Sequence, residues 1–241
     1  RVAHPHILSM VKPAANFDYV ARWYRWLEYA AFGRTLERCR FAFLPVLKDA
    51  RRILILGEGD GRFLQKLLSV NSSARIDVVE VSVGMLRLAR GRLSDDQVER
   101  VEFYPADARN WDFPEVEYDA IVTCFFLDCF TPKTLAELMP RITASAKPGA
   151  CWLLSEFEDP STVRSRVWLA SMHAFFRVTT NLEARQLGPF AELIAESGWE
   201  NTRRVTFADG LMSAGTWRTM FSPKLRENCG LNSLAKLVAG F

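Results

Sequence analysis

An apolar run that leads into a glycine-rich, acidic turn is the segment of this chain best suited to chemistry. Residues 53–56 are four aliphatic residues in succession, and the next five positions read Gly57-Glu58-Gly59-Asp60-Gly61. An unbroken aliphatic run is typical of a parallel strand that is covered on both faces. Glycines after such a strand allow a sharp turn and a close approach of a ligand to the backbone. The segment therefore predicts a nucleotide-like cofactor site.

A carboxylate follows at the separation expected for a ribose contact. Glu80 ends the apolar run 76–80, and residues 62–68 before it have a helical pattern. The second strand of a nucleotide-binding unit delivers an acidic side chain to the ribose hydroxyls roughly 20 residues after the glycine turn. Strand, turn, helix and second strand supply the context that a glycine motif alone lacks. The alternative interpretation is a tight turn that binds no ligand.

The spacing and charge of the turn distinguish between cofactors. Dinucleotide sites have the spacing G-x-G-x-x-G and place pyrophosphate at a helix N-terminus. Here the spacing is G-x-G-x-G, with Glu58 and Asp60 between the glycines. Two carboxylates so close to a phosphate would repel it, whereas an amino group and a sulfonium are compatible with them.

The loop resembles motif I of the class I S-adenosylmethionine-dependent methyltransferases, and further segments match in the family's order. Residues 80–86 resemble the segment after the second strand in the ubiquinone/menaquinone (UbiE-like) methyltransferases and their small-molecule relatives. Ala106-Asp107-Ala108 is similar to the motif that binds adenine. Residues 118–122 resemble the fourth strand, and Lys147-Pro148-Gly149-Ala150 resembles the turn before the fifth.

The resemblance also reaches the N-terminal part of the chain. Residues 17–24, which end in Tyr24, match the F-D-x-x-A-x-x-Y pattern that caps the cofactor in UbiE-like enzymes. The family implies an α/β fold with a Rossmann-like, seven-stranded, mostly parallel sheet and helices on both faces. It also implies an N-terminal helical lid and a C-terminal antiparallel hairpin whose last strand lies between the fifth and sixth strands. Asp209-Gly210, between strand-like segments 202–208 and 211–220, is a hairpin signal.

The resemblance implies S-adenosylmethionine as cofactor, S-adenosylhomocysteine as product, and a set of cofactor-binding residues. The three glycines would pass under the methionine and ribose, and Glu58 or Asp60 would face the amino group. Glu80 would accept hydrogen bonds from the ribose hydroxyls. Asp107 would accept from the adenine amino group, unless it is only a turn residue. The full implied set is Tyr24, Gly57, Glu58, Gly59, Asp60, Gly61, Glu80, Val81, Met85, Asp107, Ala108 and Cys124.

Two side chains are candidate bases for an acceptor that carries a proton. Asp128 follows the predicted fourth strand, whose end faces the donor methyl in this family, and His173 lies in a predicted helical insertion beside Phe175 and Phe176. Asp128 is alternatively a helix N-cap or a substrate contact, and His173 a packing or surface residue. Aromatic residues near both sites predict either core packing or a pocket for a flat, apolar acceptor. They are Trp23, Tyr24, Phe125, Phe126, Phe130, Phe175 and Phe176.

The organisation of the chain predicts a single domain. Its 241 residues are 49% hydrophobic, enough for one α/β domain with a substantial core. We expect the domain over residues 13–221, with a lid at 13–45, a cofactor-binding core at 51–157, and a helical insertion and hairpin at 158–221. Residues 222–241 form a separate tail.

Charge and cysteine content restrict the partners. The net charge of +3 does not indicate nucleic acid or an anionic membrane. Five cysteines and three histidines show no metal-ligand spacing and no C-x-x-C pair, and no apolar stretch is long enough to span a membrane. These features favour a cytoplasmic location.

The sequence thus predicts a methyltransferase acting on a small aromatic or lipophilic molecule at oxygen, nitrogen or carbon. The alternatives are an NAD-dependent oxidoreductase and a non-catalytic cofactor-binding partner subunit. Oligomeric state is left open.

Overall fold

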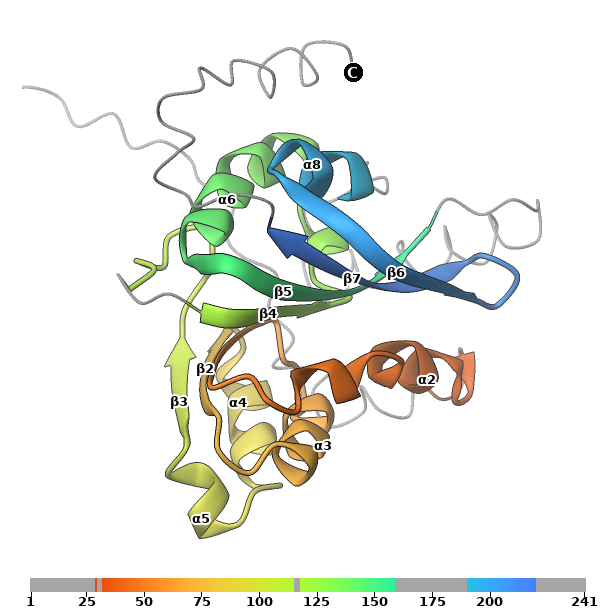
Figure 1. The fold of residues 1–241 in the computed structure, drawn as a ribbon. Helices are drawn as coiled ribbons and strands as arrows, with labels where there is room; N and C mark the ends of the chain where they lie inside the picture. The colour runs from red at the N-terminus through yellow and green to blue at the C-terminus, as the bar shows by residue number, and fades with distance from the viewer. Residues whose placement is uncertain (1–28, 30–31, 115–117, 159–189, 220–241) are drawn as a thin grey trace, which may run out of the picture.

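The architecture is one mixed seven-stranded sheet between two layers of helices (Figure 1). It is seen in a computed structural model that describes residues 29, 32–114, 118–158 and 190–219. Tyr24, His173, the helical insertion over residues 161–176 and the tail lie outside the described residues, as does most of the predicted lid. None of the helices in the described ranges is long and apolar enough to cross a membrane.

The strand order confirms the predicted fold class. The sheet runs β3-β2-β1-β4-β5-β7-β6. Strands β1 to β5 are parallel to one another, whereas β7 is antiparallel to both β5 and β6, so the last strand lies between the fifth and the sixth. The strands are β1 Arg52–Leu56, β2 Arg75–Glu80, β3 Val101–Pro105, β4 Tyr118–Cys124, β5 Ala146–Phe157, β6 Trp199–Phe207 and β7 Met212–Thr219.

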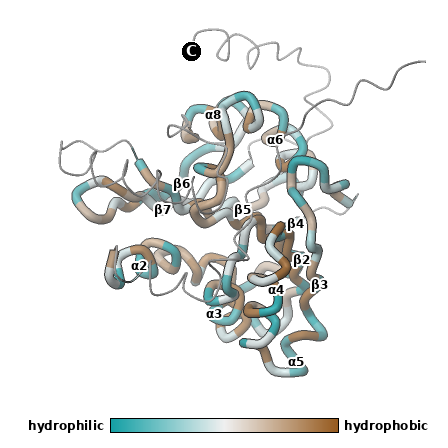
Figure 2. Tube along the Cα trace, turned by 180° about the vertical axis from the view of Figure 1, so that it is seen from behind, coloured by the Kyte–Doolittle hydropathy of each residue, from teal (hydrophilic) through white to brown (hydrophobic). Residues whose placement is uncertain are grey.

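Helices on opposite faces of the sheet make two separate cores. Figure 1 shows α3 and α4 on one face and α6 and α8 on the other, and hydrophobic residues of each layer cluster with their own side of β1 and β4. Figure 2 shows hydrophobic residues along the central strands and more hydrophilic ones near α5. The helical segments are α2 Thr35–Phe41, η1 Leu44–Leu47, α3 Arg62–Val70, α4 Val83–Arg90, α5 Asp95–Val98, η2 Leu127–Cys129, α6 Pro132–Ala144 and α8 Phe190–Glu196.

The turn predicted before the fifth strand is instead an irregularity within β5. Tyr118 of β4 pairs with Ala146, but two residues later Ala120 pairs with Cys151, so the intervening residues of β5 form an excursion from the ladder. Gly149 in this excursion has a φ of +74°, which glycine adopts without strain. The turn chemistry was predicted correctly, and its place outside the strand was wrong.

Candidate functional site

The three glycines after β1 serve different physical needs. Their φ values are +70°, +70° and +86°, a left-handed region that favours glycine. A Cβ on Gly57 would lie 2.4 Å from the ring of Phe126, and one on Gly61 would lie 2.3 Å from the Ala89 backbone. A Cβ on Gly59 would meet no atom of the described residues within 4 Å. Two glycines therefore permit close packing within the fold, whereas Gly59 borders open space.

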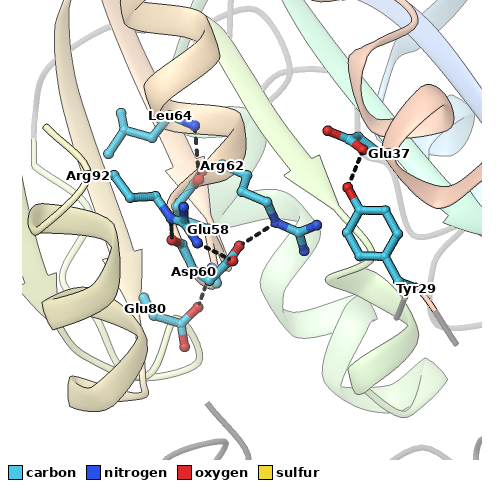
Figure 3. Close-up of polar contacts among 9 residues, drawn as sticks. Tyr29, Glu37, Glu58, Asp60, Arg62, Leu64, Glu80 and Arg92 are labelled. Atoms are coloured by element: carbon cyan, nitrogen blue, oxygen red, sulfur yellow. Dashed lines mark hydrogen bonds and ion pairs between the residues drawn. The ribbon is translucent and has the colours of Figure 1, made fainter. Parts of the chain in front are cut away.

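Glu80 ties this loop to the end of β2. Its Oε2 accepts a hydrogen bond from the Gly59 amide at 3.1 Å (Figure 3). Its Oε1 accepts one from the Ser82 amide at 2.9 Å. The residue is only 7% exposed. A carboxylate oxygen can accept more than one hydrogen bond, so the arrangement is compatible with the predicted ribose contact. The structure thus places Glu80 and Gly59 together, as the sequence predicted.

Asp60 is committed to contacts within the fold. Its Oδ1 lies 2.9 Å from Arg62 Nε, and its Oδ2 lies 2.8 Å from Arg92 Nη2. Arg92 Nε also donates to the Asp60 carbonyl at 2.6 Å. Figure 3 shows both guanidinium groups turned toward this carboxylate. Of the two acidic residues in the loop, Asp60 already has its charge compensated.

The charge of Glu58, unlike that of Asp60, has no compensating ion pair among the described residues. Its Oε1 accepts the Leu64 amide at 2.9 Å, but its Oε2 is buried and has no hydrogen-bond partner among the described residues. Burial raises the pKa of this carboxyl to about 8, and the nearby Asp60 and Glu80 charges add to the increase. The Leu64 amide and the buried Arg40 of α2 act in the opposite direction. A buried carboxylate oxygen without a partner suits a cationic group of a ligand.

The predicted adenine motif has an internal partner that the sequence analysis missed. Asp107 Oδ1 accepts the Arg109 amide at 2.9 Å, and Oδ2 accepts from Arg109 Nε at 2.8 Å and Nη2 at 2.6 Å. Arg141 of α6 holds the same segment by donating to the Arg109 carbonyl at 2.5 Å. The Asp107 side chain therefore shapes the turn, which was the alternative interpretation. Ala108 is buried at 5% exposure.

Val81 and Met85, both in the implied cofactor-binding set, differ in exposure. Val81 is half-buried directly after β2, whereas Met85 on α4 is 2% exposed and packs inside the protein. Val81 thus presents side-chain surface in this structure, and Met85 presents almost none.

The segment after β4 brings buried acidic groups close to the glycine loop. Asp128 in η2 is 8% exposed, and burial raises its pKa. Glu156, which the sequence analysis missed, is 1% exposed, and its Oε1 accepts the amides of Phe126 and Leu127. Cys124 is half-buried, and burial raises its thiol pKa.

Aromatic rings surround this segment. Phe125 lies 5.0 Å from Phe157, and Phe126 lies 5.0 Å from Phe130, measured between ring centroids. The other four aromatic residues of the predicted pocket lie outside the described residues. In the described part of the chain, no group of three or more metal-ligating side chains is present.

Comparison with known proteins agrees with this geometry. Residues 53–149 match the family described as a methyltransferase domain. The match covers the strands, the glycine loop and the adenine motif from which the site is built.

A curated relative covers about half of the chain. Over 120 residues, this chain is 34% identical to the demethylmenaquinone methyltransferase of Clavibacter sepedonicus. The aligned region is 49% of this chain and 45% of that protein. The chain therefore spans less than half the length of this relative.

Solved structures share the fold of the methyltransferase domain. The mitomycin 7-O-methyltransferase MmcR has a TM-score of 0.62 at 17% identity, covering 85% of this chain and 60% of its own. Human N-acetylserotonin methyltransferase in complex with SAM has a TM-score of 0.58 at 18% identity, covering 83% and 55%. At these identities the likeness shows a common fold.

Proposed function

We propose that this chain is an S-adenosylmethionine-dependent methyltransferase that transfers a methyl group to a small aromatic or lipophilic acceptor. S-adenosylhomocysteine is the second product. The methyltransferase domain match and the strand order support the class of reaction. The acidic glycine loop supports this donor over a dinucleotide, because Glu58 in its ionised form attracts an amino group and repels a phosphate.

The observation that carries this proposal is the buried Oε2 of Glu58, which has no hydrogen-bond partner among the described residues, next in sequence to Gly59, where these residues leave open space. A buried ionised carboxylate needs a compensating charge. The amino group of the donor's methionine part supplies one. Of the two acidic residues that the sequence left as alternatives, Glu58 is therefore assigned this contact, since two arginines already neutralise Asp60.

The remaining contacts follow from the positions of the loop and of β2. Glu80 would hold the ribose while keeping its bond to the Gly59 amide. Val81 would contact the adenine face, and the backbone at Ala108 would meet the adenine edge, held by the Asp107–Arg109 turn. The bound donor supplies a methyl group already activated on a sulfonium. The protein's task is therefore to align the acceptor and exclude water.

The acceptor side is proposed from the aromatic residues after β4. Phe125, Phe126 and Phe130 offer flat, apolar surface next to the glycine loop. The relatives named above act, according to their names, on demethylmenaquinone, mitomycin and N-acetylserotonin. A small aromatic acceptor is consistent with this surface. Asp128 and His173 stay the candidate bases.

We further propose a cytoplasmic enzyme without a nucleic-acid partner. The four cysteines in the described ranges are free thiols, as expected in a reducing compartment.

Calorimetry with S-adenosylmethionine, S-adenosylhomocysteine and NADH tests the proposal. We expect micromolar binding of the two sulfur ligands and none of NADH. Binding of NADH alone would replace the proposal with a reductase. After positive binding, a panel of phenols, quinols and amines identifies the acceptor by the appearance of S-adenosylhomocysteine.

A further inference from the structure

Two buried carboxyl groups lie where β4 and β5 end side by side. Cys124 pairs with Ser155 in the parallel ladder, so Asp128 and Glu156 both follow this paired position closely. Asp128 is 8% exposed and Glu156 is 1% exposed. Acidic side chains are rarely buried unless they are paired or hydrogen-bonded. Their burial together at the carboxyl ends of β4 and β5 therefore suggests that they have a specific role.

One oxygen of Glu156 fixes the turn that covers the glycine loop. Its Oε1 accepts the Phe126 amide at 3.1 Å and the Leu127 amide at 2.9 Å. The turn is strained, because Phe125 has a φ of +55°. The Phe126 ring occupies the space in which a side chain at Gly57 would lie. Glu156 thus stabilises the segment after β4 that packs against the cofactor loop.

The other carboxylate oxygen of Glu156, Oε2, is buried and accepts no hydrogen bond from the described residues. Burial and the Asp128 charge raise the pKa of Glu156 well above its usual range, against the opposing effect of the Leu127, Phe126 and Asp128 amides. Like charges at one buried site cannot both ionise readily. The pair therefore favours a state with one proton.

Other titratable groups near the pair keep it in that state. Cys129 Sγ lies 3.7 Å from Asp128 Oδ1, and burial with the surrounding carboxylates raises the thiol pKa, so Cys129 stays a donor to Asp128. Glu80 of β2 acts on the same thiol, and Glu156 acts on Cys39 of α2 and Cys124 of β4. These neighbours are neutral thiols and one carboxylate, together with the buried cation Arg40, which also acts on Cys39 and Cys124 and lies over the Phe125 ring.

We propose that Asp128 and Glu156 form one carboxyl pair with a single proton at neutral pH, in which Glu156 is the neutral, positioning member and Asp128 is the carboxylate that receives the acceptor's proton. This inference rests on the proposed methyltransferase function and narrows the acceptor to an oxygen or nitrogen nucleophile that carries a proton. As the new bond to the methyl carbon forms, the methyl–sulfur bond breaks with its electron pair left on sulfur. The acceptor's proton moves to the Asp128 carboxylate.

Two variants of Glu156 distinguish the roles of its two carboxylate oxygens. In Glu156→Gln the side-chain carbonyl still accepts the Phe126 and Leu127 amides, and the amide group imitates a protonated acid. In Glu156→Ala both functions are lost. We therefore expect Glu156→Gln to keep the wild-type affinity for S-adenosylhomocysteine, and Glu156→Ala to weaken it through the loosened turn. Equal affinity in both variants would refute the positioning role.

Carboxyl titration by NMR of the full chain, with ¹³C-labelled Asp and Glu side chains, tests the shared proton without any acceptor. We expect Glu156 to be protonated at pH 7, the Asp128 midpoint to be the same in Glu156→Gln as in the wild type, and the Glu156 midpoint to fall in Asp128→Asn. A Glu156 that titrates near the ordinary value of about 4.3 would overturn the inference. So would a fall of the Asp128 midpoint in Glu156→Gln. Failure of the wild type to bind S-adenosylhomocysteine would instead reject the proposed function, whatever the carboxyl groups show.

Discussion

Binding of S-adenosylmethionine should release a proton from Glu58. Burial raises the pKa of this carboxyl to about 8, so at pH 7 roughly nine-tenths of the unliganded protein carries the proton. The donor's amino group is a cation and requires the ionised carboxylate. Formation of the complex therefore displaces roughly 0.9 proton at pH 7.

The affinity for S-adenosylmethionine should therefore depend on pH. Ionising a group one pH unit below its pKa costs about 1.4 kcal/mol. Only the ionised fraction binds well, and it grows roughly ninefold between pH 6 and pH 7. The association constant should rise by that factor over this interval, in which the ligand's amino group stays protonated.

Calorimetry in buffers of different ionisation enthalpy measures the released proton directly. Glu58→Gln keeps an acceptor for the Leu64 amide but cannot ionise, so its binding should be weaker and independent of pH between 6 and 7. 5′-Methylthioadenosine, which lacks the amino acid part, should bind the wild type without proton release. Proton release that is unchanged in Glu58→Gln would refute the contact between Glu58 and the amino group.

The unliganded protein offers an independent check of the same carboxyl. Because its pKa is raised from 4.5 to about 8 on folding, the folded state holds a proton that the unfolded state has lost between these pH values. Stability should therefore fall as pH rises through this window, by up to about 1.4 kcal/mol per pH unit. Denaturant unfolding at several pH values should show a shallower decline in Glu58→Gln.

Further substitutions test the remaining parts of the site. Glu80→Ala removes the acceptor of the Gly59 amide and should weaken cofactor binding by about 1 to 3 kcal/mol; unchanged calorimetric affinity would remove Glu80 from the ribose contact. Gly59→Val should abolish binding, whereas Gly149→Val, at a similar φ of +74° and equally without neighbours, should bind normally; loss of binding in both would indicate strain alone. With an acceptor found by the panel, Asp128→Asn should lower kcat by about 10²- to 10⁴-fold, and Glu156→Gln should retain turnover at pH 7; a fully active Asp128→Asn would leave alignment as the source of catalysis.

Local patterns predicted the elements that carry the cofactor loop. The aliphatic run at 53–56, the three glycines and Glu80 occupy the positions in β1, the turn and β2 that their types require. Asp209 and Gly210 form the predicted hairpin turn, with φ values of +53° and +85°. These features depend on neighbours in sequence, so a single sequence reveals them.

Contacts between distant segments were not predictable in the same way. The pairing of Asp60 with Arg92, 32 residues away, depends on how α4 packs beside α3. The burial of Glu156 depends on the ladder between β4 and β5. An acidic residue inside the mostly apolar run 151–157 was the one available signal for Glu156. Sequence alone gave Glu58 and Asp60 as equivalent alternatives, and only their partners distinguish them.

Because of that difference, Glu58 and Asp60 should differ in how far each can be replaced without changing the shape of the loop. Asp60, joined to Arg62 and Arg92, preserves the shape of the loop whether or not a ligand is present. The Glu58 side chain accepts a hydrogen bond from the Leu64 amide, and its other oxygen is the one for which the contact with the donor's amino group is proposed. Replacements at position 58 can therefore alter which molecule is accepted while the loop keeps its form. Position 60 does not offer this freedom, so a search for donor analogues with an altered amino acid part should vary position 58 first.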